Sequence, residues 1–128
     1  MVPTVKDNRP VNLDIGTMRL PITAWASITH RATGVILFVG TAVLIWALAT
    51  SLSGPEGFAS VEAALASPLA KLVIWGVLAA LIYHTLAGIK HLIMDLGVGE
   101  SMEGGITGAR IVIGLSVVLI ALAGVWIW

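Results

Sequence analysis

Three stretches of mainly apolar residues dominate this 128-residue chain, and each is long enough to cross a lipid bilayer as a helix. A spanning helix needs about 20 such residues, because the hydrocarbon core is about 30 Å thick. The sequence predicts spans from about Ile22 to Leu52, from about Leu69 to Met94 and from about Ile106 or Ile111 to Trp128. We therefore expect an all-α integral membrane protein, with a single membrane-anchor domain over residues 1–128.

Composition excludes several other classes. Charged residues make up 11% of the chain and hydrophobic residues 58%, whereas soluble domains are roughly a quarter charged. A net charge of zero gives no basic field for nucleic acid. The chain has no cysteine, so its own residues form no disulfide, hold no iron–sulfur cluster and attach no haem covalently. Residues 1–21 carry Asp7 and Asp14 and lack an apolar centre, so they are not expected to be a secretory signal.

The distribution of lysine and arginine predicts the orientation. The N-terminal segment and the flanks of the second connection hold most of them: Lys6, Arg9, Arg19, Lys90 and Arg110. The first connection offers Lys71 alone, beside Glu56 and Glu62. Because positive charge stays on the cytoplasmic side, we expect the N-terminus (residues 1–21) in the cytoplasm and the C-terminus outside the cytoplasmic membrane.

A first cluster of polar residues lies early in the first span. Ser27, His30 and Arg31 stand at i, i+3 and i+4 and share one helical face. Ionisable residues inside spans mark functional sites by default, and this set suits an anionic or carbonyl-bearing ligand. The alternative is structural: Arg31 reaches the lipid phosphates and Ser27 bonds back to its own helix.

A second cluster lies in the second span, where His84 follows Tyr83 and stands roughly 15 Å from the end of the helix. A histidine this deep indicates metal ligation or pairing with another helix. His84 and His91 share a face but lie about 10 Å apart along the axis, too far to ligate one iron. If His84 binds a haem with two axial histidines, the second is His30 or belongs to another chain. His91 is placed to pair with Asp95, four residues on.

Small residues along the spans permit close helix contacts: Gly34, Gly40, Ala80, Ala87 and Gly88. Three spans form a thin bundle in which to enclose a haem. We therefore expect a partner subunit with further spans to complete the bundle.

Two sequence patterns resemble a known family. Arg9-Pro10, followed by Ser27-Ile28-Thr29-His30-Arg31-Ala32-Thr33-Gly34, resembles the R-P…S-x-x-H-R-x-[ST]-G pattern of the cytochrome b556 subunits of succinate dehydrogenase, the larger membrane anchors of complex II. His84 to His91 and Met94 to Gly97 resemble that family's second pattern, H-x-x-x-G-[apolar]-R-H…D-x-G. The segment Ser51 to Phe58 is also similar to the connecting loop of the enterobacterial type. Lys90 departs from the pattern, because the family usually has arginine there.

The resemblance implies a complex in which a flavoprotein oxidises succinate and an iron–sulfur subunit relays electrons to two small membrane anchors. These anchors share one haem b and a ubiquinone site. By this resemblance His84 is the haem's axial ligand and the other anchor supplies the second histidine. His30 and Arg31 contact the haem propionates, Ser27 and Arg31 border the quinone, and Lys90, His91 and Asp95 are supporting residues. No catalytic residue is assigned to this chain, which carries no flavin.

The expected function is therefore that of a membrane anchor of succinate:ubiquinone oxidoreductase in the bacterial inner membrane. It would pass electrons from the iron–sulfur subunit to ubiquinone, linking the tricarboxylic acid cycle to the aerobic respiratory chain. The expected partners are the second anchor, the iron–sulfur subunit, the flavoprotein and lipid, with no nucleic acid. Two alternatives are the anchor of a fumarate reductase, which would favour menaquinone, and a noncatalytic membrane adaptor that would be colourless.

Overall fold

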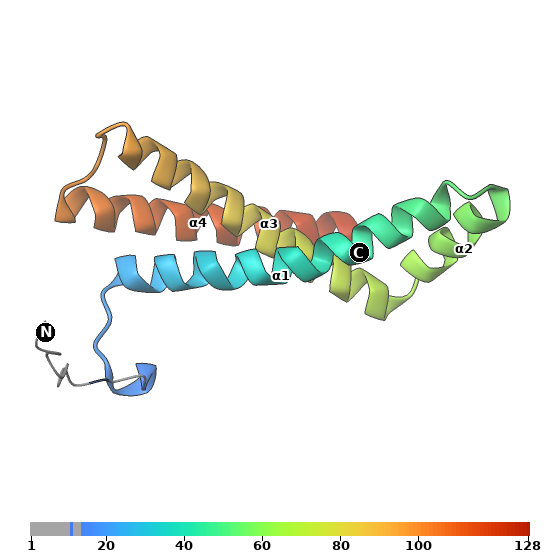
Figure 1. Ribbon diagram of the computed structural model, residues 1–128, viewed down its shortest axis with the longest axis horizontal. Coiled ribbons are helices and arrows are strands. Elements are labelled where there is room, and N and C mark those ends of the chain that lie inside the picture. Colours follow the sequence, from blue (N-terminus) through green and yellow to red (C-terminus); the bar gives the residue numbers. More distant parts are fainter. Residues whose placement is uncertain (1–10, 12–13) are drawn as a thin grey trace, which may run out of the picture.

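The computed structural model describes residue 11 and residues 14–128, and every regular element in that part of the chain is helical. This confirms the all-α class. Lys6, Arg9 and Pro10, on which part of the expected orientation and of the family pattern rests, lie outside the described residues. A short 3₁₀ turn is followed by four α-helices (Figure 1): η1 spans Ile15–Thr17, α1 Ile22–Ser51, α2 Pro55–Leu65, α3 Pro68–Asp95 and α4 Met102–Ile127.

Helices α1, α3 and α4 are long and apolar enough to cross a membrane, which confirms the three expected spans. They contain 30, 28 and 26 residues. At 1.5 Å per residue they are roughly 39–45 Å long, more than the ~30 Å of a hydrocarbon core. Each helix therefore crosses at a tilt or extends beyond the hydrocarbon. Most of their apolar surface is exposed in the single chain, and lipid or partner helices must cover it.

The ends of the helices are set by capping residues. Helix α3 begins after Ser67, whose hydroxyl accepts a hydrogen bond from the Ala70 amide at 3.3 Å. Helix α4 begins after Ser101, whose hydroxyl accepts from the Gly104 amide at 3.1 Å. Both are typical N-caps. Helix α4 therefore starts before the expected Ile106, because its capped first turn is helical without being apolar.

The sequence does not predict helix α2, because the residues between the first two spans are typical of a turn. Gly54 has a φ of 138°, a conformation that favours glycine. Pro55 then takes the first helical position, where its fixed φ and missing N–H are tolerated. The helix folds back against α1 and α3 (Figure 1). It closes one end of the molecule.

Helix α3 runs antiparallel to both α1 and α4, and it contacts both of them. The start of α1, the end of α3 and the start of α4 lie at one end (Figure 1). We call this the N-terminal end of the bundle. Helix α2 lies at the opposite end.

The buried core consists mostly of small side chains. Such residues let helix backbones approach closely, so van der Waals contacts accumulate even without a hydrophobic effect in lipid. A Cβ on Gly40, for example, would lie 3.1 Å from the side chain of Val77. Of the two buried polar residues, Thr33 bonds to its own helix, whereas Ser116 Oγ has no partner among the residues described. The other buried residues are Ala26, Gly40, Ala80, Tyr83, Ala87, Gly105, Ala109 and Val112.

Candidate functional site

His84 lies near the middle of α3 and faces α1. Its Nδ1 is 3.1 Å from the backbone oxygen of His30 and 3.3 Å from Thr33 Oγ1. A carbonyl oxygen only accepts hydrogen bonds, so His84 Nδ1 carries the proton and donates it. The Thr33 hydroxyl donates its own hydrogen to the backbone oxygens of Thr29 and His30, at 3.0 and 2.8 Å. The Thr33 oxygen can therefore accept a hydrogen bond from His84 Nδ1. The imidazole is thereby held in one tautomer.

The other ring nitrogen of His84 is left available. With Nδ1 protonated, a neutral imidazole keeps its lone pair on Nε2. Nε2 has no hydrogen-bond partner among the described residues, and it is not buried. A histidine whose one nitrogen donates to a carbonyl while the other is free has the arrangement found in metal-binding histidines. The ring is suited to ligate a metal from outside the chain.

Gly34 on α1 provides the space that the His84 ring occupies. A Cβ built on Gly34 would lie 3.2 Å from His84 Cε1 and 3.6 Å from Nδ1. Any side chain at this position would therefore push against the imidazole. All three α1 groups that contact the ring lie within residues 30–34: the His30 carbonyl, the Thr33 hydroxyl and Gly34. A single turn of α1 therefore positions the ring.

His30 lies between two other histidines. Its ring stacks on His84, with centroids 4.1 Å apart and 28° between the planes, and lies 5.3 Å from the ring of His91. His30 Nε2 is buried, lies 3.9 Å from where a Cβ on Gly88 would be, and has no hydrogen-bond partner in the described part of the chain. A buried unsatisfied nitrogen is costly, and Nε2 of His30 is therefore placed to bond to a polar group outside the described residues. Among the residues described, no three metal-ligating side chains converge on a common metal position.

Tyr83 fixes the two helices beside this histidine cluster. Its hydroxyl donates to the backbone oxygen of Ala26 at 3.0 Å, and the side chain is 8% exposed. The bond joins α3 to α1 one residue from His84. It therefore holds the axial position of α3 against α1 where His84 meets Thr33 and Gly34.

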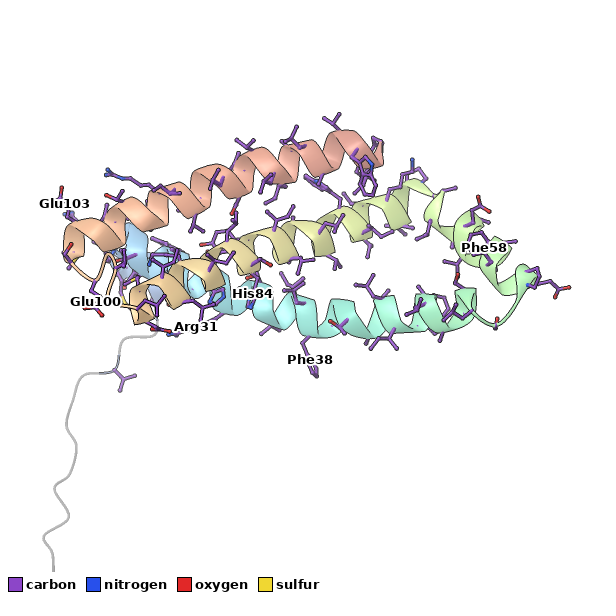
Figure 2. The ribbon with its side chains drawn as sticks, turned by 90° about the horizontal axis from the view of Figure 1, so that it is seen from above. Arg31, Phe38, Phe58, His84, Glu100 and Glu103 are labelled. Carbon is purple, nitrogen blue, oxygen red and sulfur yellow. The ribbon has the colours of Figure 1, made fainter. Side chains whose placement is uncertain are left out.

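Ser27 and Arg31 lie on α1 beside His30. Ser27 is half-buried and Arg31 is exposed, and neither side chain has a hydrogen bond or ion pair with any residue described. In Figure 2, Arg31 lies between His84 and the N-terminal end of the bundle, where Glu100 and Glu103 are. Both side chains are therefore free to meet a ligand or a partner.

The three expected supporting residues do not lie together. The His91 ring approaches His30 on α1. Lys90 instead lies along α4, because a Cβ on Gly108 would come within 3.0 Å of its Cε. Asp95 is exposed, and no ion pair links it to His91 in the described residues. The structure thus brings His91 to the cluster and directs Lys90 to another helix.

Sequence reasoning assigns no role to Thr33 and only a packing role to Gly34. The available signal is their spacing, because Thr33 follows His30 by three residues and Gly34 by four. That spacing places both on the same helical face as His30. Both residues contact His84 on α3. The spacing of residues within α1 gives no information about which residue of α3 lies opposite.

Comparison with known proteins identifies the family. Residues 5–123 match the family described as succinate dehydrogenase/fumarate reductase transmembrane subunit. The chain is 40% identical to the succinate dehydrogenase cytochrome b556 subunit of Coxiella burnetii over 121 residues, which is 94% of this chain and 97% of that protein. It is 35% identical to the subunit of the same name from Paracoccus denitrificans, covering 91% and 90% of the two chains.

A mitochondrial protein is also similar. The chain is 37% identical to the mitochondrial succinate dehydrogenase cytochrome b560 subunit of Sus scrofa over 97 residues, which is 72% of this chain and 56% of that protein. All three relatives are named as cytochrome b subunits of succinate dehydrogenase. The chain therefore belongs to the family of succinate dehydrogenase and fumarate reductase transmembrane subunits, in which it is a cytochrome b membrane anchor of succinate dehydrogenase.

Proposed function

We propose that His84 Nε2 is the axial ligand that this chain gives to one haem b, and that the chain borders the ubiquinone site of its complex. The observation that carries the proposal is the fixed tautomer of His84. Its Nδ1 donates to the His30 carbonyl at 3.1 Å, which leaves Nε2 unprotonated and without a partner among the residues described. A neutral imidazole held in this way is a good metal ligand.

The second axial ligand would come from the other anchor subunit. Two axial ligands approach an iron from opposite sides, each about 2 Å from the metal. The rings of His30 and His84 instead lie face to face, 4.1 Å apart. Two stacked rings do not point at a common centre between them, so His30 is not suited to be the second ligand. This supports a haem shared between two subunits.

His30 and Arg31 are suited to the haem propionates. His30 Nε2 is buried without a partner in the described chain, and the Arg31 guanidinium is exposed and unpaired there. Both can donate hydrogen bonds to a carboxylate when protonated. The haem supplies a one-electron redox centre, and its potential depends on the axial ligands and on the polarity around it. The role of this chain would be to hold the haem and to tune its redox potential.

Ser27 and Arg31 are suited to ubiquinone. The Ser27 hydroxyl would donate to a quinone carbonyl, and Arg31 would stabilise the negative charge that develops on the quinone oxygens as electrons arrive. Both side chains lack partners among the residues described, so no internal bond has to break first. Their position near the start of α1 puts them at the N-terminal end of the bundle.

This end would face the soluble subunits. Lysine and arginine are concentrated in the N-terminal segment and around the connection between the second and third spans. This distribution favours a cytoplasmic N-terminus in the bacterial inner membrane. The flavoprotein would oxidise succinate, the iron–sulfur subunit would deliver electrons to the quinone, and a second anchor would complete the haem site. The exposed apolar surface of α1 and α4 leaves ample area for such a partner.

The test is a visible difference spectrum of the purified complex, dithionite-reduced minus oxidised, for wild type, His84→Leu and Thr85→Val. Thr85 is the exposed neighbour of His84 on α3, and its substitution controls for the effect of changing a polar residue in this helix. We expect a b-type α-band in wild type and in Thr85→Val, and its loss or displacement in His84→Leu. An unchanged band in an assembled His84→Leu complex would exclude His84 as the ligand.

A further inference from the structure

Two adjacent residues of α3 bond to two successive turns of α1. The Tyr83 hydroxyl donates to the backbone oxygen of Ala26 at 3.0 Å, and His84 Nδ1 donates to the backbone oxygen of His30 at 3.1 Å. Ala26 and His30 are four residues apart, so their carbonyls lie one turn apart on the side of α1 that faces α3. The two bonds together restrain the rotation of α1 about its axis as well as its height along α3.

The residues proposed to bind ubiquinone each follow one of these two carbonyls. Ser27 comes directly after Ala26, and Arg31 comes directly after His30. Because an α-helix has 3.6 residues per turn, Ser27 and Arg31 share a face that is turned by about 100° from the face held by α3. Neither side chain has a partner among the residues described, so the rotation of α1 sets the direction in which each one points.

The Tyr83 hydroxyl contributes direction rather than packing. The Tyr83 ring is buried in a cluster with Ala87 of α3 and Val112 of α4. A phenylalanine would fill the same space without a hydroxyl to desolvate. The Ala26 oxygen does not need this hydroxyl either, because a carbonyl inside a helix already accepts a bond from the next turn. The bond therefore serves to hold α1 in one orientation against α3.

We propose that Tyr83 is a positioning residue for quinone reduction, whose hydroxyl holds the turn of α1 at Ala26 and thereby aims the Ser27 hydroxyl at a quinone carbonyl. This role of Tyr83 rests on the proposed role of Ser27. Tyr83 is not a quinone ligand itself, because it donates its only hydroxyl proton to Ala26. His84 holds the next turn in the same way, so the haem ligand and the quinone donor are fixed to one short stretch of α1.

The experiment measures ubiquinone reduction by the whole purified complex in wild type, Tyr83→Phe, Ser27→Ala and the double variant. We expect Tyr83→Phe to lower kcat/KM for ubiquinone about three- to tenfold, which is the scale of one hydrogen bond between membrane helices. Succinate oxidation with an artificial acceptor should be unchanged. In the Ser27→Ala background, Tyr83→Phe should lower kcat/KM by less than about twofold, because residues that act through one contact are not additive.

Trp75→Phe is the matched control. Trp75 Nε1 donates to the backbone oxygen of Ile120 at 2.9 Å, so this variant also removes a bond from α3 to a helix carbonyl, but nearer the opposite end of the bundle. It should lower thermal stability without changing kcat/KM for ubiquinone.

Two outcomes would overturn the role of Tyr83 alone: a double variant whose loss is the full product of the two single losses, or equal losses in Tyr83→Phe and Trp75→Phe. Normal ubiquinone reduction in Ser27→Ala would instead contradict the proposed role of Ser27, and the role of Tyr83 would fail with it.

A second measurement keeps the hydroxyl and does not depend on the assembly of Tyr83→Phe. Tyr83 is the only tyrosine of this chain, and it is replaced by 3-fluorotyrosine through site-specific incorporation. The fluorine resonance is recorded in the whole complex before and after saturation with ubiquinone-1. We expect the resonance to shift on binding, and the shift to be much smaller when Ser27→Ala is also present. No shift without that substitution, or an equal shift with it, would overturn the proposal.

Discussion

The imidazole of His84 on α3 stacks on the imidazole of His30 on α1, with ring centroids 4.1 Å apart. The backbone oxygen of the same His30 accepts the hydrogen bond from His84 Nδ1. His30 thus contacts the proposed haem ligand twice, once through its side chain and once through its main chain. A substitution removes only the first contact, so the two can be separated by experiment.

Replacing His30 by alanine should weaken haem retention without abolishing it. The variant loses the stacked ring but keeps the carbonyl that fixes the tautomer of His84. Groups that orient a metal ligand typically change affinity by about 10–100-fold, and we expect the lower part of that range. The measurement is haem per complex after gel filtration, compared with His84→Leu. Complete loss of haem in an assembled His30→Ala complex would contradict the separation of the two contacts.

Replacing Gly34 by alanine should displace the His84 ring. The added Cβ would lie 3.2 Å from His84 Cε1, and overpacking of this kind typically destabilises by about 1–3 kcal/mol. We expect a shifted α-band and a lower midpoint of thermal unfolding. Gly76→Ala is the matched control on α3, because a Cβ there meets nothing within 4 Å. If both variants behave alike, Gly34 is not the position that makes room for the ring.

Replacing Thr33 by valine should loosen His84 while keeping the volume of the side chain. The hydroxyl lies 3.3 Å from His84 Nδ1, and a net hydrogen bond contributes about 0.5–1.5 kcal/mol. We expect haem to dissociate several-fold faster, with Thr33→Ser restoring the wild-type rate. Thr41→Val removes a hydroxyl that bonds only to its own helix and should have no effect. A dissociation rate in Thr33→Val equal to that of wild type would argue against this contact.

Replacing Ser27 by alanine should impair quinone reduction but not succinate oxidation. The hydroxyl is half-buried and unpartnered among the described residues, and a hydrogen bond to a group that becomes charged contributes about 1.5–3 kcal/mol. We therefore expect a loss of roughly ten- to a hundredfold with ubiquinone and none with an artificial acceptor. Ser53→Ala, at the opposite end of the bundle, is the control. Equal loss with both acceptors would exclude a role in quinone binding.

Two aromatic residues of α3 provide a comparison of stability with haem binding. Tyr83 donates to the Ala26 carbonyl at 3.0 Å beside the histidine cluster, whereas Trp75 donates to the Ile120 carbonyl at 2.9 Å nearer the other end. Tyr83→Phe and Trp75→Phe should each lower stability, for the tyrosine by about 0.5–1.5 kcal/mol. Only Tyr83→Phe should also change the haem spectrum. A spectral change in both would mean that haem binding follows overall stability rather than the local contact.

Several features of this protein could be predicted from the sequence. The three spans follow from length and hydropathy, because lipid accepts only segments that satisfy their own backbone hydrogen bonds. His84, His30 and Arg31 stand out because ionisable residues are rare in such segments. Helix α2 could not be predicted in this way, because it is too short and too polar to resemble a membrane span. It also begins with residues typical of a turn.

The number of membrane-spanning helices, and the polar residues within them, could be read from the amino-acid sequence alone. Which side of each helix meets which neighbour follows only from how the helices pack. The packing of the helices placed His30 between His84 and His91, turned Lys90 toward α4, and left Nε2 of His84 without a partner among the described residues. Because lipid and the interior of the bundle are equally apolar, hydropathy does not mark the buried side of a helix. The rotation of each helix is set by close packing at small residues such as Gly34 and Gly108, and that packing exists only between helices.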